Sequence, residues 1–277
     1  MKYIKALDIT NAVTRLYDDI CCNIDEGTSK ALINAEISES KPLCKFALSV
    51  MNENIALAKS EHIAACQDTG MAVIFLEIGR DVHIEGNIEV AINEGVRSAY
   101  QKYFRKSVLD PINRINTKDN TPAIIHYEIV EGDNMKISAM AKGFGSENMS
   151  RLYMLTPADG IIGIKKAVIE AVKDSGGCAC PPVIVGVGIG GTMEKAAMLS
   201  KKSLLREIGI RNSKKEISEL EKELLIEINN IGNGAQGLGG DITALEVFIE
   251  IFPTHIAGLP IAINMQCHCN RHKSIII

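Results

Sequence analysis

Apolar residues recur at two periods along the chain, and these periods predict its helices and strands. Helical spacing of about 3.6 residues gives the first helix a regular apolar face: Ile9, Val13, Leu16, Ile20 and Ile24. Asp8 or Thr10 is expected to cap the start of this helix. Similar spacing predicts further helices over 87–104, 161–172, 193–208 and 213–231.

Shorter apolar runs predict strands over 71–78, 123–130, 135–141, 183–187, 242–252 and 259–265. The turn residues Glu131 to Asn134 separate two of these runs, which predicts an antiparallel hairpin. Strands and helices mix without an internal repeat or a linker. We therefore expect an α+β fold, with helices packed around small mixed or antiparallel sheets, in a single domain over 1–277.

Composition narrows the functional classes. The net charge is −4, whereas a general nucleic-acid binder is expected to be basic. No run of about 18 apolar residues is available to span a membrane, and the first residues do not resemble a signal peptide. The chain has eight cysteines but does not need disulfides at this size. We expect a cytoplasmic protein with reduced thiols.

The richest polar motif is the pentapeptide Cys66-Gln67-Asp68-Thr69-Gly70. It combines a thiol, an amide, a carboxylate and a hydroxyl with a glycine that can turn the backbone. A long helical stretch through Ala64 and Ala65 leads into it, and the apolar run from Met71 follows. The motif is therefore expected at a helix-to-strand junction, where a loop can present polar side chains over a rigid scaffold.

A second motif resembles a nucleotide-binding loop. Gly186, Gly188, Gly190 and Gly191 follow an apolar run and precede a predicted helix. They fit the dinucleotide pattern only in part, because no acidic residue follows at the expected distance of about 20 residues, and a P-loop lysine is also missing. A nucleotide-binding module stays open as an alternative, and the helix start after these glycines suits an anion.

Cysteines suggest a metal. Cys178 pairs with Cys180, and Cys267 with Cys269, at one-residue spacing. Two such pairs can form a structural zinc site, but zinc knuckles usually separate their cysteines by two residues. Three thiolates on distant loops, including Cys66, would suit an iron–sulfur cluster with one open iron. Spacing alone leaves the cluster, zinc and unliganded thiols open. The other thiols are interpreted as buried small hydrophobic residues: Cys21, Cys22 and Cys44.

Around these cysteines the sequence resembles the iron–sulfur hydro-lyases, namely class I fumarate hydratase and L(+)-tartrate dehydratase. Beyond the pentapeptide, the matching stretches are Lys142-Gly143-Phe144-Gly145-Ser146, Ala179-Cys180-Pro181-Pro182, Lys222 to Glu227, Gly234-Ala235-Gln236 and the segment through Cys267. They span nearly the whole chain in the family's order. The resemblance implies a [4Fe-4S] cluster held by Cys66, Cys180 and Cys267, with the substrate on the fourth iron. Cys178 and Cys269 are then neighbours and not ligands.

The resemblance also implies contacts with a small dicarboxylate substrate. Gln67 and Asp68 match residues that approach the substrate, and Asp68 is expected to steer protons or water. Arg105 matches an arginine that binds a substrate carboxylate, which suits the bidentate geometry of a guanidinium. Gly145 matches a glycine whose backbone lies against the substrate. His255 matches a histidine that lines the site, where an imidazole can move a proton.

Single-chain members of this family continue into a second domain that supplies further arginines, a lysine and the expected base. The chain therefore resembles the α subunit of the two-subunit form, and we expect it to need a separate β subunit. The implied reaction is the hydration of fumarate to L-malate, a step of the tricarboxylic acid cycle. L(+)-Tartrate dehydration to oxaloacetate is the alternative. Association between α chains is also expected, because the aliphatic helices offer apolar surface.

Overall fold

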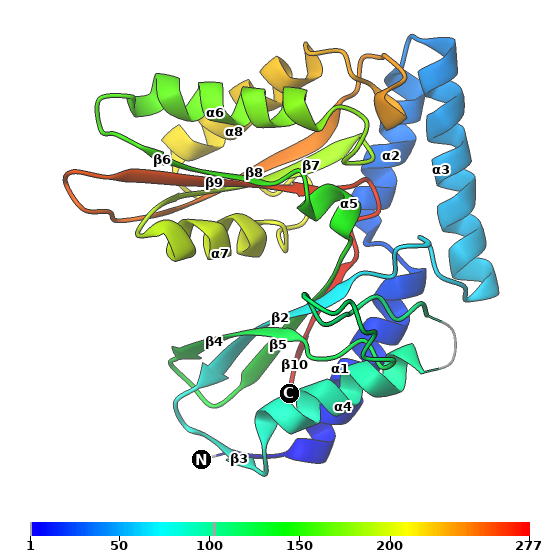
Figure 1. Cartoon of the computed structure of the whole chain (residues 1–277), viewed down its shortest axis with the longest axis vertical. Helices are drawn as coiled ribbons and strands as arrows, with labels where there is room; N and C mark the ends of the chain where they lie inside the picture. The colour runs from blue at the N-terminus through cyan, green and yellow to red at the C-terminus, as the bar shows by residue number, and fades with distance from the viewer. Residues whose placement is uncertain (1, 102–103) are drawn as a thin grey trace. The chain divides into compact units, whose positions relative to one another are not determined.

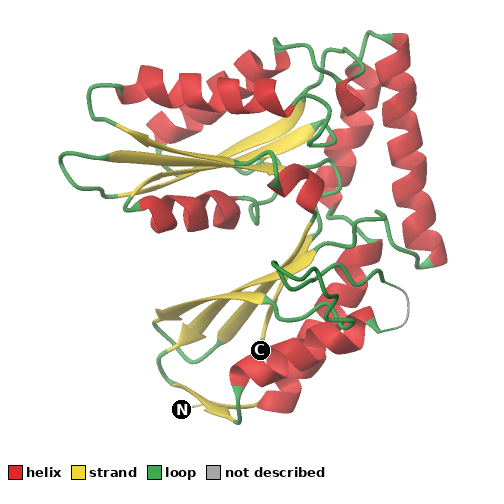
Figure 2. Cartoon of the chain, viewed as in Figure 1, coloured by secondary structure: helices red, strands yellow, loops and turns green. Residues whose placement is uncertain are grey.

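The structure is a computed structural model that describes residues 2–101 and 104–277. By their internal contacts, these residues form two compact units. Among the described residues, unit 1 contains 2–25, 54–101, 104–144 and 271–277, and unit 2 contains 26–53 and 145–270. Both units combine helices with small mixed sheets, which confirms the predicted α+β class (Figure 2). A single functional domain over 1–277 stays a prediction.

Unit 1 is built on a four-stranded sheet with the order β10-β5-β2-β4. Its elements are β1 (Lys2–Lys5), α1 (Ala6–Cys22), β2 (Met71–Gly79), β3 (Val82–Glu85), α4 (Ile88–Tyr100), β4 (Ile124–Val130), β5 (Met135–Lys142) and β10 (His272–Ile276). The short strands β1 and β3 form a separate parallel pair. Helices α1 and α4 pack against each other beside the sheet (Figure 1). The sequence pattern did not predict β1, β3 and β10.

The first helix follows its apolar pattern. Ile9, Val13, Leu16 and Ile20 are all buried in the core between α1 and the sheet. The helix begins earlier than expected, at Ala6, and ends at Cys22, so Ile24 lies beyond it. Asp8 does not precede the helix; its Oδ2 accepts a hydrogen bond from the backbone N of Lys5 at 3.3 Å. A carboxylate in the first turn stabilises the helix start in the same way as a cap.

The predicted hairpin is wrong, although both of its strands exist. β4 and β5 do not pair with each other, because β2 lies between them. β2 pairs in parallel with β4 and antiparallel with β5. The turn at 131–134 instead closes the end of β2, where the backbone N of Gly79 donates to the carbonyl of Asn134 at 2.9 Å. Turn residues specify a reversal of the chain, but they do not specify which strand becomes the neighbour.

Unit 2 has a second four-stranded sheet, with the order β6-β9-β7-β8. Its elements are α2 (Glu26–Ser38), α5 (Phe144–Glu147, of which Phe144 belongs to unit 1), β6 (Arg151–Leu155), α6 (Gly160–Ser175), β7 (Val183–Gly190), α7 (Met193–Ser203), α8 (Lys215–Asn229), a 3₁₀ turn (Ala235–Gly237), β8 (Ala244–Phe252) and β9 (Leu259–Gln266). Helix α3 (Pro42–Glu61) starts in unit 2 and ends in unit 1. β7 runs parallel to β8 and antiparallel to β9. Figure 1 shows α7 on one face of this sheet and α6 with α8 on the other.

The glycines that resemble a nucleotide-binding loop have a packing role. β7 continues through Gly186 and Gly188 to Gly190, so most of these glycines lie in the strand. A Cβ on Gly188 would lie 2.1 Å from the carbonyl oxygen of Ala196 in α7. A Cβ on Gly186 would lie 2.2 Å from the carbonyl oxygen of Ser200. Glycine is therefore required here because α7 packs directly on the strand backbone.

The remaining predicted elements exist with shifted ends. The helix expected over 87–104 is α4, for which Asn87 is the cap: its side chain accepts a hydrogen bond from the N of Val90 at 3.0 Å. Part of the predicted span, residues 102–103, lies outside the described residues. The helices expected over 193–208 and 213–231 are shorter at Met193–Ser203 and Lys215–Asn229. In the part of the chain that the structure describes, no helix is long and apolar enough to cross a membrane.

Candidate functional site

The pentapeptide lies in the connection between α3 and β2, as the pattern predicted. The helix ends at Glu61, however, so Ala64 and Ala65 belong to the loop and not to the helix. The Cys66 side chain is half-buried and Gln67 is exposed. The loop therefore presents a thiol and an amide at the surface of unit 1.

Asp68 is the most constrained side chain of the pentapeptide. Its Oδ1 accepts a hydrogen bond from the backbone N of Gly70 at 3.0 Å, and its Oδ2 accepts one from the N of Phe144 at 2.7 Å. The first bond is local, and the second ties the loop to the residues after β5. Two backbone donors hold the carboxylate in one orientation. Gly70 itself requires glycine, because its φ is +82° and a Cβ would lie 2.8 Å from the carbonyl carbon of Ala141.

Gly143 leaves a small space between two charged side chains. A Cβ at Gly143 would lie 3.3 Å from Oδ2 of Asp68 and 3.5 Å from Nη2 of Arg271. The guanidinium of Arg271 is therefore close to the Asp68 carboxylate within unit 1. Arg271 is fully buried, which is unusual for an arginine. No motif marks Arg271 as a site residue; its position directly after the cysteine-rich segment is the one signal in the sequence.

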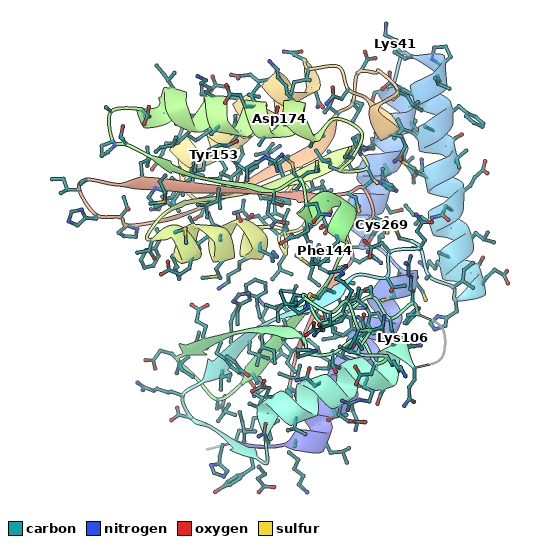
Figure 3. The ribbon with its side chains drawn as sticks, viewed as in Figure 1. Lys41, Lys106, Phe144, Tyr153, Asp174 and Cys269 are labelled. Atoms are coloured by element: carbon teal, nitrogen blue, oxygen red, sulfur yellow. The ribbon has the colours of Figure 1, made fainter. Side chains whose placement is uncertain are left out.

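The structure also brings Arg105 beside the pentapeptide. The Thr69 hydroxyl donates a hydrogen bond to the carbonyl oxygen of Arg105, and the Arg105 side chain is exposed. The hydroxyl of the buried Tyr100 donates a hydrogen bond to the carbonyl oxygen of Thr69 at 2.7 Å. Burial raises the pKa of Tyr100 well above its usual value, so it remains a hydrogen-bond donor. Lys106, labelled in Figure 3, follows Arg105 in the same loop.

Cys180 lies in unit 2, at the loop that enters β7. Its backbone has a φ of +55°, in the left-handed region that a non-glycine residue rarely adopts. The N of Cys180 donates to the carbonyl oxygen of Gly177 at 3.0 Å. This conformation turns the chain directly before Pro181, and the thiol remains half-buried. Unusual backbone conformations of this kind often occur at functional sites.

Cys267 reaches the same edge of the sheet as Cys180. It directly follows β9, which is antiparallel to β7, so the end of one strand lies beside the start of the other. Its neighbour His268 joins the two loops: the Nδ1 and backbone N of His268 donate to the carbonyl oxygen of Cys180 at 3.0 and 3.5 Å. Two of the three predicted ligands are therefore brought together within unit 2.

The other cysteines differ in their surroundings. Cys178 is exposed and Cys269 is buried, and the backbone oxygen of Cys178 lies 3.6 Å from the position of a Cβ on Gly145. Gly145 is exposed, so its backbone is accessible. The interpretation of three further thiols as buried hydrophobic residues is confirmed: Cys21, Cys22 and Cys44. Burial raises the pKa of Cys22 and of Cys44 to about 11.

His255 lies apart from these cysteines within unit 2. It is exposed in the connection between β8 and β9, and its Nδ1 accepts a hydrogen bond from the N of Ala257 at 3.2 Å. β9 then runs from Leu259 to Gln266 before it reaches Cys267. At about 3.3 Å per residue, this strand separates the two residues by roughly 25 Å. Unit 2 therefore does not place His255 beside Cys180 and Cys267.

Cys66 belongs to unit 1, whereas Cys180 and Cys267 belong to unit 2. Among residues 2–101 and 104–277, no group of three or more His, Cys, Asp or Glu side chains is arranged to hold a metal ion. The structure thus assembles a thiol pair in one unit, and a thiol with an oriented carboxylate and two arginines in the other. The set of three thiolate ligands stays a prediction.

Comparison with known proteins identifies the family of this chain. The model of the family described as fumarate hydratase (fumerase) matches residues 10–276. A Methanocaldococcus jannaschii protein named "Putative L(+)-tartrate dehydratase subunit alpha" is 43% identical over 273 residues, with 96% of each chain covered. The L(+)-tartrate dehydratase subunit alpha of Escherichia coli O157:H7 is 31% identical over 269 residues, covering 95% of this chain and 86% of its own. This chain therefore belongs to the fumarate hydratase (fumerase) family.

Proposed function

We propose that this chain is the α subunit of a hydro-lyase that adds water to, or removes it from, a small dicarboxylate. The family match over residues 10–276 supports the reaction class, and the two relatives named as α subunits support the subunit assignment. The observation that carries the proposal is the pairing of Cys180 with Cys267 at one edge of the unit 2 sheet, joined through His268. Their proximity supports our assignment of both residues as cluster ligands.

We infer that Cys66, Cys180 and Cys267 hold a [4Fe-4S] cluster. The donor set fits, because soft thiolates are the usual ligands of iron–sulfur clusters. All three cysteines are free of disulfide bonds. Each lies on a loop at the end of a strand or at its start, where a cluster can be approached. When bound, the cluster would supply a Lewis acid at its open iron.

The chain's own residues would bind and orient the substrate. The exposed Arg105 guanidinium can hold one carboxylate in a bidentate manner. The backbone N–H groups of Gly70 and Phe144 fix the Asp68 carboxylate, so that it can orient the substrate's hydroxyl or a water molecule. Gln67 supplies an adjacent amide, and Gly145 presents accessible backbone. We also propose a proton-moving role for His255, which unit 2 holds at the opposite end of the sheet from Cys180 and Cys267.

We propose hydration of fumarate to L-malate, a step of the tricarboxylic acid cycle, as the reaction, in line with the family's description. L(+)-Tartrate dehydration is the second candidate, favoured by the names of the two α-subunit relatives. In either case we propose a separate β subunit that supplies the general base, association between α chains, and a cytoplasmic location that keeps the thiols reduced.

The test is an iron and sulfide assay on the chain purified without oxygen, together with its visible spectrum. Changing Cys66, Cys180 or Cys267 to Ser should abolish the cluster absorbance. The matched variants Cys178→Ser and Cys269→Ser should retain it. Adding the β subunit should then produce turnover of fumarate or tartrate. A chain that takes up no iron and sulfide even after reconstitution would refute the proposal, as would full turnover by the α chain alone.

A further inference from the structure

Glu39 is a buried carboxylate with no part in the proposed reaction. It follows α2 and is only 3% exposed. Its Oε1 accepts a hydrogen bond from the N of Lys41 at 2.9 Å (Lys41 is labelled in Figure 3). Both of its oxygens accept from the N of Asp241, at 3.1 and 2.9 Å, and Oε2 also accepts from the N of Ile242 at 3.3 Å. A carboxylate that accepts several backbone N–H groups forms a strong, oriented anchor.

The segment that Glu39 holds is residues 232–241, which we call the glycine loop. Cys44 provides a second anchor, since its Sγ accepts a hydrogen bond from the N of Ala235 at 2.9 Å. Gly240 lies directly against both anchors: a Cβ there would lie 2.5 Å from Sγ of Cys44 and 2.7 Å from Oε2 of Glu39. The glycine loop is therefore packed tightly on the connection between α2 and α3 and on the first turn of α3.

The other side of the glycine loop contacts the loop that carries Cys180. The backbone N of Gln236 donates to the carbonyl oxygen of Pro181 at 2.8 Å, and its Nε2 donates to the same oxygen at 3.3 Å. A Cβ on Gly177 would lie 2.9 Å from the carbonyl oxygen of Gln236. Gln236, like Cys180, has a φ of +55°. Both strained residues need neighbours that hold them in place.

We propose that Glu39 is a positioning residue: together with Cys44 it holds the glycine loop against Pro181 and so fixes the thiol of Cys180. The importance of this for catalysis rests on the proposed role of Cys180 as a cluster ligand. The series of contacts runs entirely within unit 2, from the end of α2 through the glycine loop to the start of β7. The Cys180 loop is then held on two sides, by Gln236 on one and by His268 on the other.

The test compares Glu39→Gln with the matched control Glu36→Gln in the full chain, with and without iron and sulfide. Glu36 accepts a hydrogen bond from Nδ2 of Asn52 at 2.7 Å, so it also joins α2 to α3 but does not contact the glycine loop. In Glu39→Gln, the side-chain NH₂ group would face backbone N–H groups that donate to the Glu39 carboxylate in the wild type. We expect amide hydrogen exchange at 235–237 and 178–180 to become about tenfold faster, because charge-assisted hydrogen bonds are lost.

Two further readouts separate positioning from general destabilisation. Alkylation of Cys180 in the cluster-free chain, followed by mass spectrometry, should become about tenfold faster in Glu39→Gln, while alkylation of Cys66 stays unchanged. The loaded protein should lose iron faster to a chelator, and Glu39→Asp should restore part of the wild-type rate. If Glu39→Gln does not fold, Cys44→Ala tests the second anchor with the same measurements.

Each outcome is decisive. Exchange and Cys180 alkylation that stay within about twofold of the wild type would overturn the inference, as would an equal effect of Glu36→Gln. A wild-type chain that never binds iron and sulfide would refute the proposed function. The exchange and alkylation results would still decide whether Glu39 positions the Cys180 loop.

Discussion

Substituting Gly188 with alanine tests the packing role of the β7 glycines against the nucleotide-binding alternative. The new methyl group would lie 2.1 Å from the carbonyl oxygen of Ala196 and 2.6 Å from the backbone N of Ser200. Carbon contacts are favourable at about 3.5–4.0 Å, so α7 must move away from the sheet by roughly 1.4 Å. Backbone atoms on both sides cannot rotate away as a flexible side chain would.

Overpacking of a core typically costs about 1–3 kcal/mol, and two backbone contacts place Gly188→Ala near 3 kcal/mol. At about 2–4 °C per kcal/mol for a chain of this order of size, Tm should fall by roughly 6–12 °C. The measurement is thermal unfolding followed by far-UV circular dichroism, together with the urea midpoint. The matched control is Gly258→Ala, where the nearest atom to a new Cβ is 3.9 Å away. This control should stay within about 0.5 kcal/mol of the wild type.

If Gly188→Ala unfolds at the same temperature as Gly258→Ala, the packing argument is refuted. The nucleotide-binding alternative makes the opposite prediction, since a loop glycine that contacts phosphate would affect ligand binding and leave Tm nearly unchanged. Isothermal titration of both variants with a nucleotide would then show which explanation holds.

Two other predictions concern the site and its support. Gly143→Ala would place a methyl group 3.3 Å from Oδ2 of Asp68 and 3.5 Å from Nη2 of Arg271. It should lower kcat by about tenfold and reduce the free energy of unfolding by less than about 1 kcal/mol. A large fall in Tm would contradict this. For Glu39, burial raises the pKa, but the N–H groups of Lys41 and Asp241 outweigh it and hold the pKa below its usual 4.5. The unfolded chain then binds the proton more readily, so the stability that Glu39 contributes is complete above about pH 4.5 and is lost as the pH falls through the folded pKa. In a plot of the urea midpoint against pH, Glu39→Gln should therefore show a smaller decrease than the wild type below about pH 4.5.

Periodicity predicted the elements whose packing is local. The apolar face of α1 follows from helical spacing, and β2 follows from a continuous apolar run. Strand order could not be predicted in this way, because β2 lies between two strands that follow each other in sequence. The four residues of β1 and the terminal β10 carry too short a pattern to be distinguished from loops.

In the candidate site, too, local motifs could be predicted from the sequence, whereas contacts between distant segments could not. Cys180 and Cys267 were identified from their motifs, and their proximity follows from the antiparallel pairing of β7 and β9. The sequence gives no sign that Arg271 lies near Asp68, because that contact depends on where the chain returns after the cysteine-rich segment. His255 was also suggested by the resemblance, but the sequence does not show at which end of the sheet it lies. In the structure it lies at the opposite end from Cys180 and Cys267.

The return of the chain from unit 2 to β10 has a consequence for biosynthesis. β10 pairs with β5, yet the larger part of unit 2, residues 145–270, is synthesised between them. As the ribosome elongates the chain, the sheet of unit 2 can form while the edge of β5 is still unpaired, because β10 has not yet been synthesised. An unpaired, largely apolar edge strand is prone to misassociation, so the nascent chain has a window in which a chaperone would be useful. Arg271, the residue before β10, can reach Asp68 only after that window, so we expect the Cys66 loop to be completed late in folding.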